Sequence, residues 1–144
     1  MKILLDNGAK MPVRAHEADA GYDLFAIESK TIPAGGSAVF DTGVHVELPT
    51  ITVGDQVFNT VGMVKSKSGL NVKHGLTSEG VIDAGYTGSI RVKLYNHSDR
   101  PYEVQAGDKI SQLVILPILT PRLKLVAKLT ATERGDGGFG STGR

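Results

Sequence analysis

Cysteine and tryptophan are both absent from the 144-residue chain. Without cysteine the chain cannot form a disulfide, and no thiol is present to act as a nucleophile or a metal ligand. An excess of one charge is also missing, since 16 Lys and Arg side chains nearly balance 15 Asp and Glu side chains. The net charge of +1 gives no large basic surface, so we expect no nucleic-acid partner.

Long apolar runs are missing too. The longest spans residues 113–119 and is interrupted by Pro117, whereas a membrane-spanning helix needs about 20 apolar residues. At the N-terminus, apolar residues 3–5 are followed at once by Asp6, which leaves no room for the apolar core of a signal peptide. We therefore expect one soluble, cytoplasmic domain with no membrane partner.

Short segments in which apolar and polar residues alternate dominate the chain instead. In one of them Ile90, Val92 and Leu94 fall on one side. Arg91 and Lys93 fall on the other, which is the two-residue period of a β-strand. The predicted strands are residues 22–27, 39–48, 56–64, 79–83, 89–95, 102–105, 110–116 and 123–129.

Glycine is abundant, with 18 residues, and together with Pro and Asp it marks turns between these segments. Helical periodicity is limited to one or two turns at residues 67–74, where Gly69 weakens the pattern. Many short strands with close turns favour a β-sandwich or β-barrel over βαβ units. The expected fold is therefore all-β, with at most one short helix.

Residues 131–144 form a glycine-rich segment with no core pattern. It contains Gly-x-Gly-x-x-Gly at residues 135–140, but a dinucleotide-binding fingerprint must follow a strand and open a helix, and neither is predicted here. A flexible tail is the simplest interpretation, because glycine loses much backbone entropy on ordering. The alternative is a segment that binds phosphates and a base, since it carries Arg134 and Phe139 among the glycines. We expect a β domain over residues 1–130 and a tail over residues 131–144.

Several polar side chains interrupt the predicted strands and turns, and each has an ordinary structural interpretation. Asp83 and Tyr86 flank a predicted hairpin turn, where Asp is common at the first position. Asp23 follows Asp19 by four residues, and either carboxylate could be a solvated loop charge. Gln112 lies in an apolar run, which fits either an edge position or a site residue.

The order and identity of these clusters are more specific than any one of them. Five segments stand out, in order: AGYDL at 20–24, KSGL at 67–70, GVIDAGYTG at 80–88, GDKISQL at 107–113 and RGDGGFGSTG at 134–143. Together they resemble the five ordered motifs of the trimeric dUTPases, and the resemblance runs essentially end to end.

The resemblance implies a role for each matching residue. Asp83 would orient the attacking water and hold the 3′-hydroxyl, and Gln112 would help to place that water near the α-phosphate. Tyr86 would pack under the deoxyribose and exclude a 2′-hydroxyl, while main-chain groups around residue 80 would read the uracil edge. The implied substrate-binding residues are Lys67, Ser68, Gly69, Gly80, Val81, Ile82, Asp83, Tyr86, Arg134, Phe139, Gly140, Ser141 and Thr142.

The resemblance also implies a fold, an assembly and a reaction. The fold would be a distorted jelly roll, assembled as a homotrimer with sites shared between subunits and closed by the tail. The reaction would be Mg²⁺-assisted hydrolysis of dUTP to dUMP and pyrophosphate, which keeps uracil out of DNA and supplies dUMP for thymidylate synthesis. Asp23 would contact Mg²⁺ through water, because Mg²⁺ tends to keep its hydration shell.

Two departures from the family pattern stand out. Ser66 and Lys67 replace a Pro-Arg pair, and lysine lacks the two-pronged grip of arginine on phosphate. Residues 50–55 also lengthen the stretch before the second motif, which suggests an extra loop. Two other functions stay open: a regulatory or binding protein on the same fold, and a dCTP deaminase, which would need a glutamate base.

Overall fold

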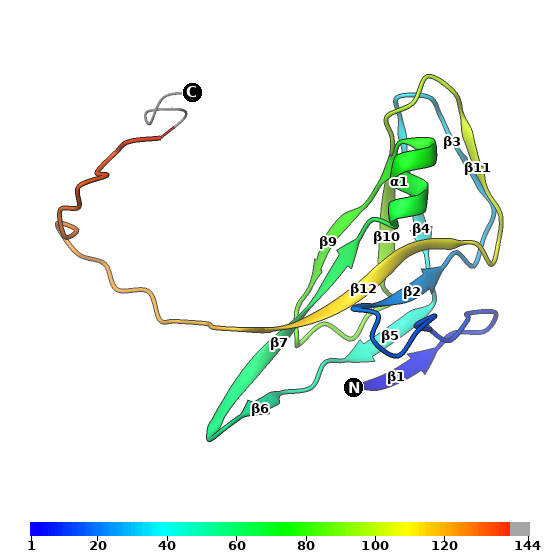
Figure 1. Cartoon of the computed structure of the whole chain (residues 1–144). Helices are drawn as coiled ribbons and strands as arrows, with labels where there is room; N and C mark the ends of the chain where they lie inside the picture. The colour runs from blue at the N-terminus through cyan, green and yellow to red at the C-terminus, as the bar shows by residue number, and fades with distance from the viewer. Residues whose placement is uncertain (139–144) are drawn as a thin grey trace.

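The computed structural model describes residues 1–138 as antiparallel β-strands with one short helix and a long C-terminal extension (Figure 1). The elements are, in chain order, β1 (Lys2–Leu5), β2 (Gly21–Phe25), β3 (Lys30–Ile32), β4 (Ser37–Asp41), β5 (Val44–Glu47), β6 (Ile51–Val53), β7 (Gln56–Lys65), α1 (Ser68–His74), β8 (Leu76–Thr77), β9 (Glu79–Ile82), β10 (Arg91–Asn96), β11 (Tyr102–Val104) and β12 (Lys109–Ile118). The all-β expectation is confirmed.

The strands form four antiparallel sheets. The largest has the order β2-β12-β7. On the other edge of β7, β6 pairs with the first residues of β7 and β9 pairs with its last residues. A second sheet has the order β4-β10-β8, and two-stranded ribbons pair β1 with β5 and β3 with β11. Strand β12 therefore lies at the centre of the largest sheet, between β2 and β7.

Each sheet contributes apolar side chains to one core. On β10 the alternation predicted from the sequence is confirmed, because Val92 and Leu94 are buried while Arg91 and Lys93 are exposed. Burial of such side chains contributes about 25 cal/mol per Å² of apolar surface, so this alternation fixes which face of the strand points inward. The core residues are Leu24, Ala26, Ile32, Phe40, Val44, Val46, Leu48, Val64, Leu76, Ile82, Ile90, Val92, Leu94, Val104, Ile110 and Leu113.

The strand predicted over residues 39–48 is wrong in one respect, since it is broken at Thr42 and Gly43 into β4 and β5. Gly43 has φ +61°, a conformation that side chains with a Cβ rarely adopt. A Cβ at this position would also lie 2.8 Å from the Cβ of Ala9. The break therefore lets the chain pass from the sheet of β4 to the ribbon of β1 and β5.

Helix α1 confirms the predicted helical turns at residues 67–74. It ends at Gly75, which has φ +66° and donates its N–H to the carbonyls of Leu70 and Asn71. Lys73 in the last turn places positive charge at the negative end of the helix dipole. The helix is thus fixed at its C-terminus by glycine and leaves Lys67 at its start.

The lengthened stretch at residues 50–55 is a β-hairpin rather than an irregular loop. Strand β6 pairs with the first part of β7 around a turn at Gly54 and Asp55, where Gly54 has φ +60°. The hairpin extends beyond the body of the sheet (Figure 1). Its residues Val53 and Val57 are well exposed.

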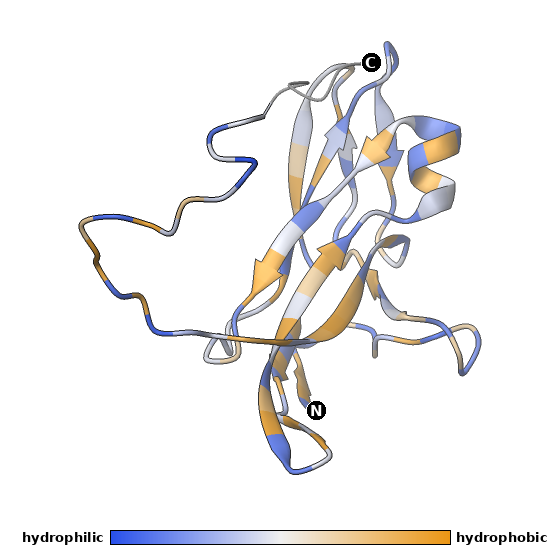
Figure 2. Cartoon of the chain, turned by 60° about the vertical axis from the view of Figure 1, so that its left-hand side comes forward, coloured by the Kyte–Doolittle hydropathy of each residue, from blue (hydrophilic) through white to orange (hydrophobic). Residues whose placement is uncertain are grey.

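The strand predicted over residues 123–129 is wrong. These residues form no strand, and Leu123 and Leu125 are fully exposed. From residue 119 the chain leaves the sheet and runs away from the body, carrying apolar and polar segments in turn (Figures 1 and 2). Because a strand needs a partner to satisfy its main chain, alternation alone could not make one here. Within residues 1–138, no helix is long and apolar enough to span a membrane.

Candidate functional site

The first cluster of predicted site residues is centred on Asp23 of β2. Its carboxylate is almost fully buried and accepts hydrogen bonds from two ammonium groups. Lys67, at the start of α1, donates to one oxygen, and Lys109, at the start of β12, lies 2.8 Å from the other. Because β12 pairs with both β2 and β7, the sheet itself brings these distant segments together.

The charges of this cluster affect the pKa of Asp23. Burial acts to raise that pKa, but the hydrogen bonds from Lys109 and Lys67 and their positive charges outweigh it, so the pKa is lowered. Asp23 is therefore ionised at neutral pH. Two ammonium groups around one carboxylate leave a net positive charge, and both lysine side chains reach solvent. Such a site favours an incoming anion.

Gln112 lies beside the same cluster, in a central strand rather than at an edge. It lies in the central strand β12, directly opposite Asp23 on β2 and Lys65 on β7. Its Nε2 donates to the carbonyl of Ser66 at 3.1 Å. A Cβ on Gly21 would lie 2.5 Å from its Oε1, so glycine at position 21 leaves room for this amide.

Lys109 is a site residue that the sequence reasoning missed. In a regular strand Lys109 and Gln112, three residues apart, would point to opposite faces. The pairing with β2 shifts register between Lys109 and Ser111, and the adjacent Ile110 and Ser111 are both buried. This bulge turns Lys109 toward Asp23. The period of the sequence gives no sign of it, although the lysine is part of the fourth motif.

A buried serine network supports the segment that carries Lys67. Ser66 Oγ donates to the carbonyl of Ser78 at 3.0 Å and accepts from its N–H at 2.8 Å. Ser111 Oγ lies 3.0 Å from Ser78 Oγ and donates to the carbonyl of Lys65 at 2.8 Å. This network fixes the end of β7, and Ser68 and Gly69 follow Lys67 in the first turn of α1. The Ser66 that replaces the family's proline therefore has a structural role.

The third motif lies on β9 and on the loop that follows it. Gly80, Val81 and Ile82 belong to β9, which pairs with β7 on one edge; within residues 1–138 its other edge has no strand partner. The Ile82 side chain is buried in the core and the Val81 side chain is exposed. The unpaired edge leaves main-chain donors and acceptors free to bind a ligand.

Asp83 and Tyr86 lie in the tight loop after β9. The Tyr86 N–H donates to the carbonyl of Asp83 at 2.9 Å, and the Tyr86 hydroxyl donates to the carbonyl of Ser89 at 3.0 Å. A Cβ on Gly88 would come within 2.5 Å of the Tyr86 hydroxyl oxygen and 2.7 Å of the ring. The ring therefore packs over Gly88, and it remains 45% exposed on its outer face.

Asp83 and the Asp23 cluster are far apart within one chain. On the ladder between β7 and β9, Glu79 is opposite Lys65 and Ile82 is opposite Gly62. Asp83 follows Ile82 and thus lies beside the middle of β7, roughly 20 Å along the strand direction from Lys67 at about 3.3 Å per residue. The structure brings together the residues of the first, second and fourth motifs, and it does not bring the third motif to them.

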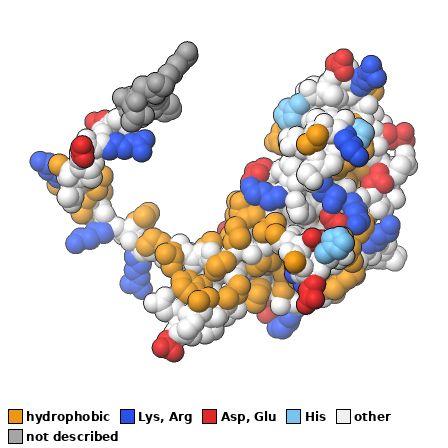
Figure 3. Space-filling model, viewed as in Figure 1, with side chains coloured by type: hydrophobic (Ala, Val, Ile, Leu, Met, Phe, Trp, Pro, Cys, Tyr) orange, Lys and Arg blue, Asp and Glu red, His pale blue; other side chains and the backbone are white. Residues whose placement is uncertain are grey.

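The C-terminal extension contains the described start of the fifth motif, residues 134–138. Arg134 is exposed, and its Nε donates to the carbonyl of Gly137 at 2.9 Å in a small turn. Apolar side chains are gathered where β12 continues into this extension, as Figure 3 shows. They include the exposed Leu116 and Leu119. The predicted substrate-binding residues Phe139, Gly140, Ser141 and Thr142 lie outside the described residues.

Metal-binding groups are sparse: residues 1–138 contain no group of three or more His, Cys, Asp or Glu side chains that could hold a metal ion. Asp23 is a single carboxylate, and lysines occupy both of its oxygens. Mg²⁺ is commonly bound through one or two carboxylates, water and substrate phosphates. The cluster therefore fits a magnesium ion that arrives with a polyphosphate better than a free ion.

Comparison with known proteins identifies the chain. The fold is all-β, and its largest sheet holds two ammonium groups around the Asp23 carboxylate, a cluster suited to an anionic ligand. The dUTPase family model matches residues 7–143, and the chain belongs to this family. A deoxyuridine 5′-triphosphate nucleotidohydrolase of Clostridium acetobutylicum is 43% identical over 96% of this chain and 92% of that protein. One from Candida albicans is 43% identical over 94% of this chain and 82% of that protein.

Solved structures agree. The dUTPase of Staphylococcus bacteriophage 80alpha with dUpNHpp is 33% identical, covers 99% of this chain and 98% of that one, and has a TM-score of 0.86. A mutant dUTPase from phage phi11 of S. aureus, described with a structural Mg(II) ion, is 33% identical, covers 88% and 96% of the two chains, and has a TM-score of 0.75. These similarities confirm the expected jelly-roll type of fold.

Proposed function

We propose that this chain hydrolyses dUTP to dUMP and pyrophosphate, which would keep uracil out of DNA and supply dUMP for thymidylate synthesis. The observation that carries the proposal is the Asp23 cluster, in which three of the five dUTPase motifs meet on one sheet of a dUTPase fold. The names of the relatives and the nucleotide analogue bound to the phage enzyme point to the same activity.

Chemically, the proposed reaction is water attack on the α-phosphorus. Asp83 accepts a proton from the water, whose oxygen forms a bond to that phosphorus. The bond from the α-phosphorus to the oxygen bridging it to the β-phosphate breaks, and pyrophosphate leaves with that oxygen. Gln112 helps to place the water, and the ammonium group of Lys67 neutralises charge on the phosphates. Catalysis of this kind depends mainly on positioning and on charge.

Specificity would come from the third motif and the tail. The free edge of β9, with Gly80, Val81 and Ile82, offers main-chain groups to the uracil edge. The exposed face of the Tyr86 ring would pack against the deoxyribose and leave no room for a 2′-hydroxyl. Arg134 would hold the γ-phosphate. Phe139 would stack on uracil, while Gly140, Ser141 and Thr142 close over the triphosphate.

Magnesium has a defined place in this scheme. Asp23 would hold the ion through water, together with the triphosphate oxygens. When bound, Mg²⁺ supplies charge neutralisation at the triphosphate. Asp23 also keeps the ammonium groups of Lys67 and Lys109 in place beside the phosphates.

We also propose that the active unit is a homotrimer with shared sites. Asp83 is too far from the Asp23 cluster to serve the same substrate within one chain. One copy would therefore supply Asp23, Lys67 and Gln112, a second would supply Asp83 and Tyr86, and a third would send its tail across. The apolar, exposed extension after β12 supports contact with another copy.

Turnover of the purified protein tests the proposal. Release of pyrophosphate from dUTP in the presence of Mg²⁺, with little from dCTP or UTP, is expected. Release of ammonia from dCTP would identify a deaminase instead. Nucleotide binding without any turnover would identify a binding protein on the dUTPase fold, and Asp83→Asn would then behave like the wild type.

A further inference from the structure

The loop of residues 83–88 returns to the body of the protein beside strand β5. Directly after the loop, Ile90 donates its N–H to the carbonyl of Val44 at 2.8 Å, and its own carbonyl accepts from Thr42 Oγ1 at 2.7 Å. Ser89 Oγ donates to the carboxylate of Asp41. The far end of the loop is thus fixed to the β4–β5 connection. His45 follows Val44 in β5, and its side chain faces the loop.

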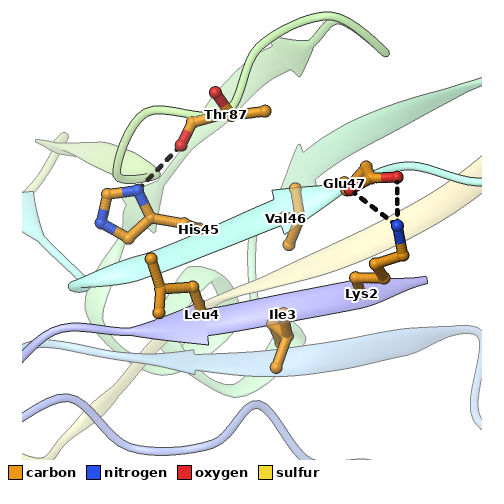
Figure 4. A pocket seen from close by; sticks show the side chains of 7 residues that line it. All are labelled: Lys2, Ile3, Leu4, His45, Val46, Glu47 and Thr87. Atoms are coloured by element: carbon orange, nitrogen blue, oxygen red, sulfur yellow. Dashed lines mark hydrogen bonds and ion pairs between the residues drawn. The ribbon is translucent and has the colours of Figure 1, made fainter.

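His45 makes a hydrogen bond to the middle of this loop. Its Nδ1 lies 2.8 Å from the carbonyl oxygen of Thr87, and its Nε2 lies 3.1 Å from Oδ2 of Asp6 (Figure 4 shows the contact with Thr87). Within the described part of the chain, no other element forms a hydrogen bond with residues 84–88. The remaining hydrogen bonds of this segment are those of Tyr86 to Asp83 and Ser89, which are internal to the turn and its exit.

We propose that His45 is a positioning residue, which holds the loop carrying Asp83 and Tyr86 in its working conformation by donating to the Thr87 carbonyl. The inference rests on the proposed function, because it assigns His45 a part in presenting the general base and the sugar-contacting ring. Thr87 directly follows Tyr86, so a shift of its carbonyl would move the ring and the turn back to Asp83.

The two partners of His45 determine which protonation state makes both contacts. A backbone carbonyl and an ionised carboxylate both only accept, so each ring nitrogen must carry a hydrogen. That arrangement exists only in the imidazolium form. A neutral ring can donate to Thr87 or to Asp6, and it then turns a lone pair toward the other oxygen. Loss of the proton therefore weakens the hold on the loop or the hold on Asp6.

The groups around the ring favour the charged form. The hydrogen bond to Thr87 and then the hydrogen bond and charge of Asp6 raise the pKa of His45, partly opposed by burial, and Asp41 adds a further attraction. Lys2 of β1 and Glu47 of β5 line the same pocket as His45 and Thr87 (Figure 4). They form an ion pair at 2.9 Å, so their opposite charges largely cancel at the ring.

The sign of the pH effect follows from the direction of this shift. A raised pKa means that the contacts are complete below the unfolded-state pKa of about 6.5. The pair of contacts is lost as the pH rises through the higher pKa of the folded protein, because a neutral ring donates to only one of the two oxygens. The loop is therefore held best on the acidic side of this window.

The test compares kcat/KM for dUTP between the wild type and His45→Gln from about pH 5.5 to about pH 8.5. Glutamine keeps one donor and does not titrate. We expect the wild type to exceed the variant by roughly three- to tenfold at the acidic end, the worth of one hydrogen bond. The ratio should fall toward one as the pH rises through the pKa of His45. His97→Gln is the matched control. The His97 ring also makes a side-chain hydrogen bond, in its case with the hydroxyl of Thr77 at 2.7 Å, but within residues 1–138 it has no hydrogen bond to the loop.

A second variant keeps His45 and changes only its partner. Asp6→Asn removes the negative charge and should move the midpoint of the wild-type pH profile to lower pH. A ratio that does not vary with pH, a profile unmoved by Asp6→Asn, or a His97→Gln variant with the same profile as His45→Gln would overturn the proposal. If the protein does not hydrolyse dUTP at all, the proposed function fails alone. Amide exchange of residues 84–88 in the wild type and His45→Gln then decides the role of His45, which requires faster exchange in the variant.

Discussion

At the scale of single residues, Asp83 is the proposed general base, and its setting is unlike that of Asp23. Asp23 is nearly buried and paired with two lysines, which suits a fixed negative charge. Asp83 is exposed at the start of a tight loop and its carbonyl, not its carboxylate, is used by the turn. Its carboxylate is therefore available to take a proton.

Replacing Asp83 by Asn should separate binding from catalysis. The amide keeps the size and hydrogen-bonding reach of the side chain but cannot accept the proton of water. We expect kcat to fall by about 10²–10⁴-fold, while the affinity for a non-hydrolysable dUTP analogue changes by less than about tenfold. Steady-state kinetics and calorimetric titration measure the two effects. A variant with near-normal kcat would remove Asp83 from the mechanism.

Lys67→Arg tests the main departure of this chain from its family. Arginine at this position keeps the charge beside Asp23 and adds a planar fork that can bind a carboxylate or phosphate with two hydrogen bonds. We expect KM for dUTP to stay the same or to fall. Lys67→Gln, which removes the charge, is the matched control and should raise KM. A large loss of activity in Lys67→Arg would show that the serine-supported segment around Ser66 is built for lysine.

At the scale of elements, the local sequence pattern was sufficient to predict a strand or helix wherever the burial of one face determined the structure. The alternation on β10 and the helical turns at residues 67–74 were predicted correctly, because each reflects contacts near in sequence. The bulge that turns Lys109 to Asp23 was not predictable, since it depends on pairing with β2. The strand proposed for residues 123–129 failed because alternation does not supply a partner strand.

Glycine at the β4–β5 break gives a prediction about stability at this scale. Gly43→Ala forces a Cβ into positive φ and within 2.8 Å of the Ala9 Cβ. Gly35→Ala is the matched control, since Gly35 has φ +63° but open space around it. We expect the control to lower the free energy of unfolding by about 1 kcal/mol and Gly43→Ala by about 2 kcal/mol or more. Denaturant unfolding at equal protein concentration measures both, and equal losses would mean that the Ala9 contact contributes nothing.

At the scale of the whole molecule, the proposed site residues of one chain fall into two separate groups. Gln112 and the two lysines lie near the Lys65 end of β7, whereas Asp83 follows Ile82, which is opposite Gly62 in the middle of β7. The extension after residue 118 leaves the body with its apolar side chains exposed. Sequence order could not show this division, because motifs adjacent along a family pattern need not meet within one subunit. The register between β7 and β9 shows that the third motif lies apart from the other described groups.

Mixed assemblies test whether subunits share sites. Deleting residues 134–144 removes none of the core residues that the structure describes within residues 1–138, so the melting temperature should hardly change while activity collapses. Tail-deleted chains and Asp83→Asn chains should each have little or no activity, but together they offer an intact base and an intact tail on different subunits. If each site takes these from different chains of a trimer, random mixing should restore about one quarter of the sites. Native mass spectrometry first verifies that mixed trimers have formed. Verified mixed trimers without activity would show that each site draws its base and its tail from one chain, and the shared-site proposal would be wrong.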